Sequence, residues 1–178
     1  KTEQSDLMQA LYGRNGESPS VVLASSTPGN CFDWAYMASK ITLEHNTPVV
    51  LLSDGYLGNG AEPWKIKSTM DMPEINPSIA IEGEEYQPYA RDEKTLSRKI
   101  ALPGTKGLEH RLGGLEKEDI TGNVSYDPEN HEKMVGIRSE KIDRIADIIP
   151  NQEIFGKEEG NLLVVGWGGT YGSLYSGV

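Results

Sequence analysis

The chain has 178 residues, enough for one domain or for parts of two. Hydrophobic residues make up 37%, with 20 glycines and 10 prolines, which is typical of a globular protein rich in loops. The formal charge of −10 argues against a nucleic acid or an anionic membrane as partner, and the apolar runs fall well short of the ~20 residues of a membrane span.

A helix is predicted at the start of the chain, with Thr2 as its N-cap and acidic residues in its first turn. Leu7, Met8 and Leu11 share one face at helical spacing, so we expect that face to be buried. Gly13 is expected to end the helix in the left-handed conformation.

Arg14 follows this predicted helix end directly, and Asn15-Gly16 continues the turn, so the arginine is carried on a loop. A guanidinium is planar and makes two parallel, charge-assisted hydrogen bonds with a carboxylate. Arg14 is therefore a candidate carboxylate-binding residue. The spacing leaves a second interpretation open, a surface arginine that closes the C-terminus of the helix.

Residues 21–24 and 48–52 are predicted strands, separated by a helix over about 30–44 with Asn30 as its cap. Pro48 ends this helix, because a residue that precedes proline disfavours the helical conformation. The second strand is apolar on both faces, as in a parallel sheet that is covered on both sides. The pattern predicts an α/β fold with a parallel sheet in three layers.

Residues 53–64 form a loop after the second strand, where α/β sheets bind ligands. Asp54 is the charged residue best placed there and is a candidate for a site loop. The alternative is a turn-forming aspartate next to Gly55. The sequence contains no Gly-Asp-Gly element with an Asn-Asn pair beyond it, the pattern associated with diphosphate binding in thiamine enzymes.

Residues 66–126 are rich in proline, glycine and charge and show little periodicity. A loop of this length is usually functional, or is an arm wrapped over a neighbour. Residues 107–119 place acidic and basic groups around glycines, which suits a loop that covers a site as well as a solvated loop.

Asp127 is predicted to cap a long helix that begins at Pro128 and ends near residue 149, before Pro150. Apolar side chains at near-helical spacing mark one buried packing stripe on it. These are Met134, Ile137, Ile142, Ile145 and Ile148.

The polar residues 151–160 are interpreted as a boundary, and residues 162–165 predict a new strand. The glycine-rich run 166–172 then leads towards a helix. Its Gly-x-Gly-x-x-x-Gly spacing differs from the dinucleotide-binding fingerprint, so a tight strand-to-helix turn is favoured over a dinucleotide-binding module. We expect the chain to be a piece of a longer polypeptide.

Cys31 is the only cysteine, so no internal disulfide forms, and the chain cannot by itself supply the four thiolates that an iron–sulfur cluster usually takes. The lone thiol and the lack of a visible signal peptide suit the cytoplasm. The histidines lie far apart without metal-ligand spacing, so no metal site is predicted. They are His45, His110 and His131.

Several stretches, in order along essentially the whole chain, carry a family resemblance. They are residues 1–7, Tyr12-Gly-Arg-Asn-Gly-Glu17, residues 47–56, Glu62-Pro-Trp64, Pro103-Gly-Thr105, Gly114-Leu-Glu116, residues 122–131 and Gly166-Trp-Gly168. Together they resemble the alpha subunit of 2-oxoacid:ferredoxin oxidoreductases, most closely the 2-oxoglutarate type.

The resemblance implies three parts. Residues 1–75 are the C-terminal part of an incomplete thiamine-pyrimidine-binding domain. Residues 76–160 are an irregular connection that contains the long helix at about 128–149. Residues 161–178 are the start of a transketolase C-terminal-like domain.

The resemblance also implies an activity, the coenzyme A-dependent oxidative decarboxylation of a 2-oxoacid. Thiamine diphosphate and Mg²⁺ are then held mainly by a beta subunit, and an iron–sulfur cluster on a partner chain passes electrons to ferredoxin. This piece alone is expected to bind none of these cofactors. Its implied partners are the beta subunit, ferredoxin, the 2-oxoacid and coenzyme A, with no nucleic acid and no membrane.

By the same resemblance, Arg14 matches the arginine that grips the substrate carboxylate, with Asn15 as a neutral donor beside it. No catalytic residue is assigned, because the family's Tyr-Pro-Ile-Thr-Pro-type stretch and the glutamate that activates the thiamine pyrimidine are absent from the chain. The isolated piece is therefore expected to be inactive. A non-catalytic segment that holds neighbouring subunits together is the alternative function.

Overall fold

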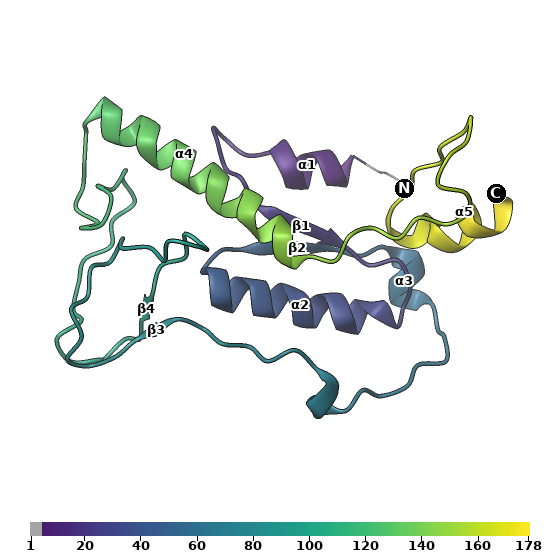
Figure 1. The fold of residues 1–178 in the computed structure, drawn as a ribbon, viewed down its shortest axis with the longest axis horizontal. Helices are drawn as coiled ribbons and strands as arrows, with labels where there is room; N and C mark the ends of the chain where they lie inside the picture. The colour runs from purple at the N-terminus through teal and green to yellow at the C-terminus, as the bar shows by residue number, and fades with distance from the viewer. Residues whose placement is uncertain (1–4) are drawn as a thin grey trace.

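The computed structural model describes residues 5–178 and contains a two-stranded parallel sheet flanked by helices (Figure 1). β1 (Val21–Ala24) pairs with β2 (Val49–Leu52) so that the first residues of the two strands lie opposite each other. The connection between them is α2 (Asn30–His45), which makes β1–α2–β2 a βαβ unit. The predicted α/β fold and its parallel pairing are confirmed.

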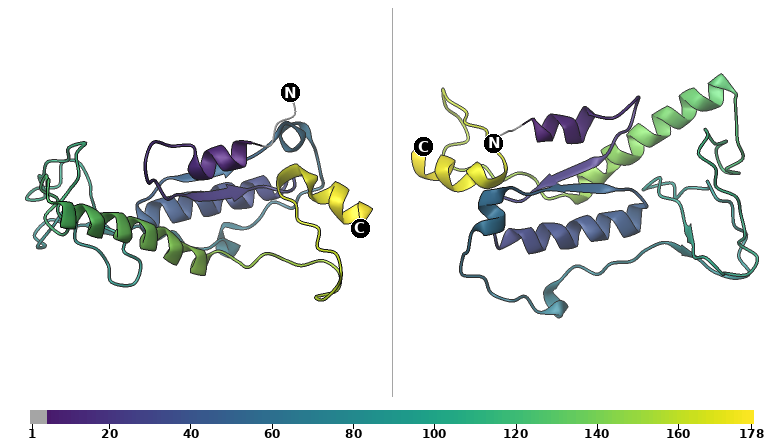
Figure 2. Two further views of the ribbon diagram at one scale, coloured as in Figure 1. Left: turned by 90° about the horizontal axis from the view of Figure 1, so that it is seen from above. Right: turned by 180° about the vertical axis from the view of Figure 1, so that it is seen from behind.

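The sheet is packed between helices from distant parts of the chain. In Figures 1 and 2 the strands lie between α1 (Asp6–Tyr12) and α2, and the C-terminal half of α4 (Pro128–Ile145) crosses them. The buried core joins Val21 and Leu23 of β1 to Ile41 of α2 and Ile145 of α4. Full burial of such a side chain stabilises the fold by about 1.5–3 kcal/mol.

The start of the chain corrects two expectations, while the predicted cap Thr2 lies outside the described residues. α1 ends at Gly13, but the φ angle of Gly13 is −80°, so it is not left-handed. Gly16 takes that conformation instead, with φ +73°. The predicted buried face is also wrong, because Met8 is 60% exposed while Leu7 and Leu11 are only half-buried.

α2 begins and ends slightly differently from the prediction. Its N-cap is Gly29, and Asn30 is the first helical residue. Asn30 accepts hydrogen bonds from the backbone N–H of Ser26 and Thr27 through Oδ1, at 3.0 and 3.1 Å, so it fixes the preceding turn rather than capping the helix. Asn46 ends the helix in the left-handed conformation.

The segment 66–126 is irregular, as predicted. It contains a 3₁₀ turn at Thr69–Asp71 and a parallel pair of two-residue strands, β3 (Ile79–Ala80) and β4 (Ile100–Ala101). In Figure 1 its first part runs along α2 and its second part folds beside the N-terminal half of α4. We call residues 77–126 the irregular segment.

α4 confirms the predicted long helix, and the Asp127 side chain caps it by accepting the N–H of Glu129 at 3.0 Å. Met134 and Ile145 are fully buried on the predicted stripe. The α-helix gives way to a 3₁₀ turn (Ala146–Ile148), which takes Ile148 off the stripe. Ile148 is 43% exposed, so its expected burial is wrong.

The predicted strand at 162–165 is also wrong, because these residues pair with no described strand. Leu163 and Val165 are each 81% exposed. An apolar run forms a buried strand only beside another strand and under a covering layer, and the described chain supplies neither here. The helix expected after the glycines is present as a 3₁₀ turn (Gly168–Thr170) followed by α5 (Tyr171–Gly177).

Candidate functional site

The Arg14 side chain folds back onto the end of α1. Its Nη1 donates to the carbonyl of Ala10 at 2.5 Å, and its Nη2 donates to that of Leu11 at 3.0 Å. Nη2 also lies 2.8 Å from the carbonyl oxygen of Ser18 and 3.0 Å from Oγ of Ser20. The last carbonyls of a helix lack intrahelical partners and carry partial negative charge, so the guanidinium closes this helix end.

One donor of Arg14 is buried and has no partner within residues 5–178. This donor is its Nε, which forms no hydrogen bond with any described residue. A buried N–H without a partner is costly, and a ligand oxygen would relieve that cost. Arg14 lines a cavity of about 340 Å³ together with Tyr12, Val135 and Ser139, which we call the Arg14 cavity. Asn15 follows Arg14 and is exposed.

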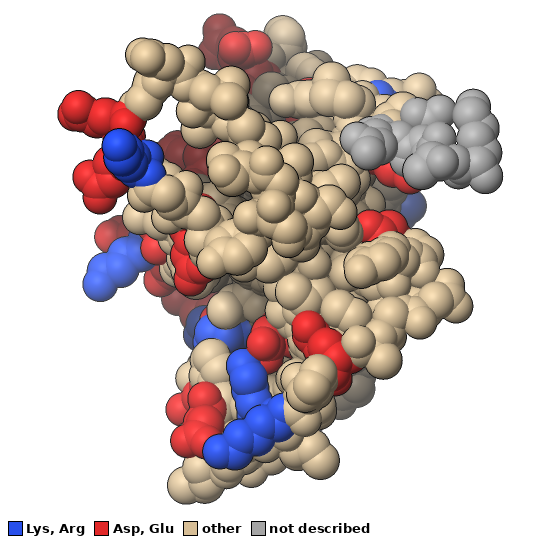
Figure 3. Space-filling view, turned by 90° about the vertical axis from the view of Figure 1, so that its right-hand side faces the viewer, with Lys and Arg blue, Asp and Glu red and all other residues tan. Residues whose placement is uncertain are grey.

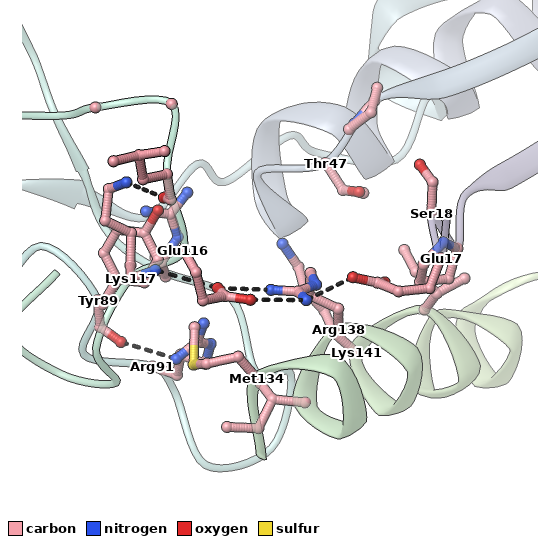
Figure 4. A pocket seen from close by; sticks show the side chains of 18 residues that line it. Glu17, Ser18, Thr47, Tyr89, Arg91, Glu116, Lys117, Met134, Arg138 and Lys141 are labelled. Atoms are coloured by element: carbon pink, nitrogen blue, oxygen red, sulfur yellow. Dashed lines mark hydrogen bonds and ion pairs between the residues drawn. The ribbon is translucent and has the colours of Figure 1, made fainter. Parts of the chain in front are cut away.

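A second cavity of about 590 Å³ lies between α4, the irregular segment and the residues that precede β1 and β2 (Figure 4). We call it the cationic cavity, because it is lined by Arg91, Arg98, Lys117, Arg138 and Lys141. Glu17, Ser18 and Pro19 line both cavities. The two sites are therefore neighbours at the amino ends of the strands.

Arg138 of α4 is the cation of this cavity whose positive charge is neutralised by carboxylates. Glu17 and Glu116 point toward it from opposite sides in Figure 4. Arg138 Nη2 lies 2.5 Å from Glu17 Oε1, and Arg138 Nη1 lies 3.1 Å from Glu116 Oε1. Burial alone would raise the pKa of Glu116, but hydrogen bonds from Arg138 and His131 outweigh it and lower that pKa to about 2. This ionic cluster ties the irregular segment to α4 and to the start of β1.

The other cations of the cavity have fewer negative partners. Arg98 stacks on the ring of Tyr89 at 4.3 Å and donates to a backbone carbonyl. Lys141 donates to the carbonyl of Asn46 at 2.9 Å. Burial lowers the pKa of Lys141 to about 8, and the nearby positive charges of Arg98 and Arg91 add to that shift.

Asp54 lies at the opposite, carboxyl end of the sheet. Its Oδ1 accepts the N–H of Leu57 at 2.8 Å and so caps the short helix α3 (Gly55–Asn59). Its Oδ2 accepts the N–H of Gly169 at 3.0 Å. A Cβ on Gly169 would lie 2.3 Å from this oxygen, so a larger residue there would displace the Asp54 carboxylate. Asp54 thus joins β2 to the glycine-rich run, which has no strand before it as a dinucleotide site would need.

The structure does not bring Asp54 together with Arg14, and it reveals cations that the sequence analysis overlooked. Arg91 and Arg98 lie in a segment without periodicity, far from Lys141 in sequence. A signal was present on α4, however. Arg138 and Lys141 fall between Met134 and Ile145 at the spacing of the buried stripe, and charged residues on a buried helix face indicate a polar site.

Within residues 5–178, no group of three or more histidine, cysteine, aspartate or glutamate side chains is arranged to hold a metal ion. None of the described helices combines the length and apolar character needed to cross a membrane.

The parallel βαβ unit makes this an α/β protein, and the Arg14 cavity and the cationic cavity adjoin the amino ends of its strands. The chain belongs to the family described as pyruvate flavodoxin/ferredoxin oxidoreductase, thiamine diphosphate-binding, whose model matches residues 1–127. The predicted family resemblance is confirmed.

Two curated relatives are named for 2-oxoglutarate. The chain is 51% identical to 2-oxoglutarate oxidoreductase subunit KorA of Mycobacterium tuberculosis, over 98% of this chain and 26% of that protein. It is 28% identical to 2-oxoglutarate synthase subunit KorA of Methanothermobacter marburgensis, over 82% of this chain and 39% of that protein. The chain therefore spans well under half of the length of these relatives.

A solved structure has the same fold. It is 2-oxoglutarate:ferredoxin oxidoreductase from Magnetococcus marinus with 2-oxoglutarate, coenzyme A and succinyl-CoA bound. The TM-score is 0.84 at 31% sequence identity, and the match covers 98% of this chain and 30% of that one.

Proposed function

We propose that this chain is part of the alpha subunit of a thiamine diphosphate-dependent 2-oxoacid:ferredoxin oxidoreductase that acts on 2-oxoglutarate. The reaction would convert 2-oxoglutarate and coenzyme A to succinyl-CoA and CO₂, with an electron pair passing to ferredoxin. The observation that carries the proposal is the 51% identity, over nearly the whole chain, to a subunit named for 2-oxoglutarate oxidation.

Within this enzyme, Arg14 would bind a substrate carboxylate, with Asn15 beside it. Its guanidinium is held by the end of α1, so its position is set before a ligand arrives. Its buried Nε has no acceptor among the described residues, and the side chain lines a cavity. A 2-oxoacid is an anion, and a chain with a formal charge of −10 needs a local cation to hold it.

We propose that the cofactors lie mainly outside this chain. A beta subunit would hold most of the thiamine diphosphate with its Mg²⁺, and a partner chain would hold the iron–sulfur cluster that reduces ferredoxin. The lone cysteine supports this division, because an iron–sulfur cluster usually takes four thiolates. We also propose that the enzyme is cytoplasmic, with residues 1–75, 76–160 and 161–178 divided as the sequence predicts.

The proposal is tested in the complete enzyme with Arg14→Ala and Arg14→Lys. Loss of a buried carboxylate contact costs about 2–5 kcal/mol, so Arg14→Ala should lower kcat/KM for 2-oxoglutarate by roughly thirtyfold or more. Arg14→Lys keeps the charge but loses the planar fork, so its kcat/KM should be intermediate. An unchanged kcat/KM in both variants would refute the assignment.

Arg111→Ala is the matched control, because Arg111 is exposed and lines neither cavity. Its kcat/KM should equal that of the wild type. Arg14 also closes α1, so thermal unfolding is measured in parallel. If the Arg14→Lys enzyme is folded but has a raised KM, the loss is in substrate binding and not in the closure of α1.

An assembly role is the second candidate, and the exposed apolar residues 162–165 favour it. The centre of the face in Figure 3 is largely uncharged. If this run is buried by the rest of the enzyme, Leu163→Asp should prevent assembly, as seen by size-exclusion chromatography. A fully assembled Leu163→Asp enzyme would contradict the assembly role and leave the Arg14 proposal untouched.

A further inference from the structure

We propose that the cationic cavity binds a phosphate group through Arg91, Arg98 and Lys141. The inference rests on the proposed function only where that phosphate belongs to coenzyme A. The cavity is open to solvent on one side and has a volume of about 590 Å³, which is larger than a single phosphate ion requires. Along the cavity wall, the lysines and arginines outnumber the carboxylates.

The negative groups near the cavity are already occupied. Glu17 and Glu116 both bind Arg138. Asp119 binds Arg91 at 2.6 Å, but it also binds Lys133 at 2.7 Å, so one carboxylate serves two cations. The cavity therefore keeps positive charge that these carboxylates do not neutralise.

Arg98 and Lys141 carry part of that surplus, and Lys117, which donates to the carbonyl of Leu115, carries the rest. The partners of Arg98 are the Tyr89 ring and the carbonyl of Pro88, and the partner of Lys141 is the carbonyl of Asn46. Neither side chain forms an ion pair with a carboxylate in the described part of the chain. Gathering half-buried cations without counter-charge is unfavourable, and the pKa of Lys141 is lowered first by burial and then by the positive charges of Arg98 and Arg91. A bound anion would offset it.

The amount and geometry of this charge favour phosphate over a carboxylate. A phosphate monoester carries about −1.5 to −2 charge at pH 7 and three acceptor oxygens, whereas a carboxylate carries a single charge. Two guanidiniums and an ammonium together match such a dianion. The phosphate would lie next to the Arg14 cavity, because Glu17, Ser18 and Pro19 line both.

The test uses the complete enzyme and inorganic phosphate as the probe, with binding measured by titration calorimetry in the absence of turnover. Arg98→Gln should weaken phosphate binding at least about tenfold, because it removes one charge-assisted contact. Arg98→Lys should restore most of it. The matched control is Lys99→Gln, which removes the neighbouring positive charge from an exposed side chain paired with Glu84 outside the cavity.

A second readout follows Lys141 directly. Its acylation rate near pH 8 is measured by peptide mass spectrometry, with and without phosphate. Bound phosphate favours the ammonium form, so labelling of Lys141 should slow about fivefold for a rise of about one pKa unit. Labelling of the exposed Lys133 should stay constant. Phosphate that leaves Lys141 labelling unchanged, or that binds Arg98→Gln as tightly as wild type, would overturn the proposal.

Coenzyme A and dephospho-coenzyme A distinguish the source of the phosphate. Stronger protection of Lys141 by coenzyme A assigns the site to its 3′-phosphate, and equal protection assigns it to the diphosphate. Protection by inorganic phosphate alone assigns it to the free ion. Each result supports a phosphate site. The phosphate-binding and labelling experiments need no turnover. An enzyme that binds phosphate but does not oxidise 2-oxoglutarate would therefore refute only the proposed function.

Discussion

The βαβ unit and the irregular segment are held in place by different forces. In the βαβ unit, Val21, Leu23 and Ile41 pack with Ile145 in a buried apolar cluster. The irregular segment has little such core. It is attached by polar contacts, such as Ser97 Oγ to the carbonyl of Glu44 at 2.9 Å. The sheet should therefore resist changes in pH and salt, while the wall of the cationic cavity should respond to both.

The irregular segment also carries strained backbone. Leu96 and Ile120 have φ angles of +54° and +68°, which is rare for residues other than glycine. Hydrogen bonds hold them, including Tyr89 N–H to the carbonyl of Ile120 at 2.9 Å. Strain of this kind concentrates at functional sites, and here it shapes the loops that carry Arg91 and Arg98.

The largest expected effect is in the core. Ile145→Ala removes a side chain that is 0% exposed at the junction of α4 and the sheet, and should cost about 2–5 kcal/mol. Hydrogen exchange should speed up in β1, α2 and α4 together. Ile148→Ala, on an exposed side chain of the following turn, is the control and should change little. Equal effects of the two variants would mean that α4 does not anchor the sheet.

Arg138→Gln should produce the next largest effect, confined to the irregular segment. It leaves Glu17 and Glu116 facing each other without their shared cation. Because Arg138 is about one-third exposed, solvent screens the pair, and we expect a loss of about 1–2 kcal/mol. Peptides covering residues 111–126 should exchange faster while β1 and β2 stay protected. Faster exchange throughout the chain would show that the βαβ unit and the irregular segment are not held in place independently.

Acid should affect the same segment through Glu116. Its pKa falls from an ordinary value of 4.5 to about 2, so its stabilising contribution is complete above about pH 4.5 and is lost as the pH falls towards 2. In wild type, exchange in residues 111–126 should rise over this window, after correction for the intrinsic exchange rate. Glu116→Gln should flatten that dependence. A variant with the wild-type pH profile would show that another group governs the segment.

Ile120→Gly should give the smallest effect, and it should be stabilising. Glycine adopts a φ of +68° without the clash that Ile120 suffers, and Ile120 is 53% exposed, so little burial is lost. We expect a gain of up to about 1 kcal/mol, seen as slower exchange around residue 120. The control is Val124→Gly, at an exposed position without positive φ, which should be destabilising.

Local patterns predicted the parts of the fold that depend on local physics. Residues 21–24 and 49–52 have apolar strand patterns, and Asp127-Pro128 marks a helix start, so β1, β2 and α4 were predicted correctly. The run at 162–165 has the same apolar character but no described partner, and it forms no strand. A strand prediction fails where the partner strand is missing.

The candidate site was predictable only where its residues are close in sequence. The turn after α1 pointed to Arg14, but the hydrogen bonds of its guanidinium to Ala10 and Leu11 depend on how the turn folds. The cationic cavity joins Arg98 to Lys141 through a segment without periodicity, so no spacing rule brings these two residues together. Such convergence is visible only in three dimensions.

The most direct test of the central claim is a structure of the complete enzyme with 2-oxoglutarate bound. We predict a substrate carboxylate oxygen within about 3 Å of a guanidinium nitrogen of Arg14, in the cavity that this side chain lines. The hydrogen bonds from Arg14 to the end of α1 should remain in place. A bound substrate whose carboxylates contact other residues, with Arg14 bonded only to its own helix, would contradict the account.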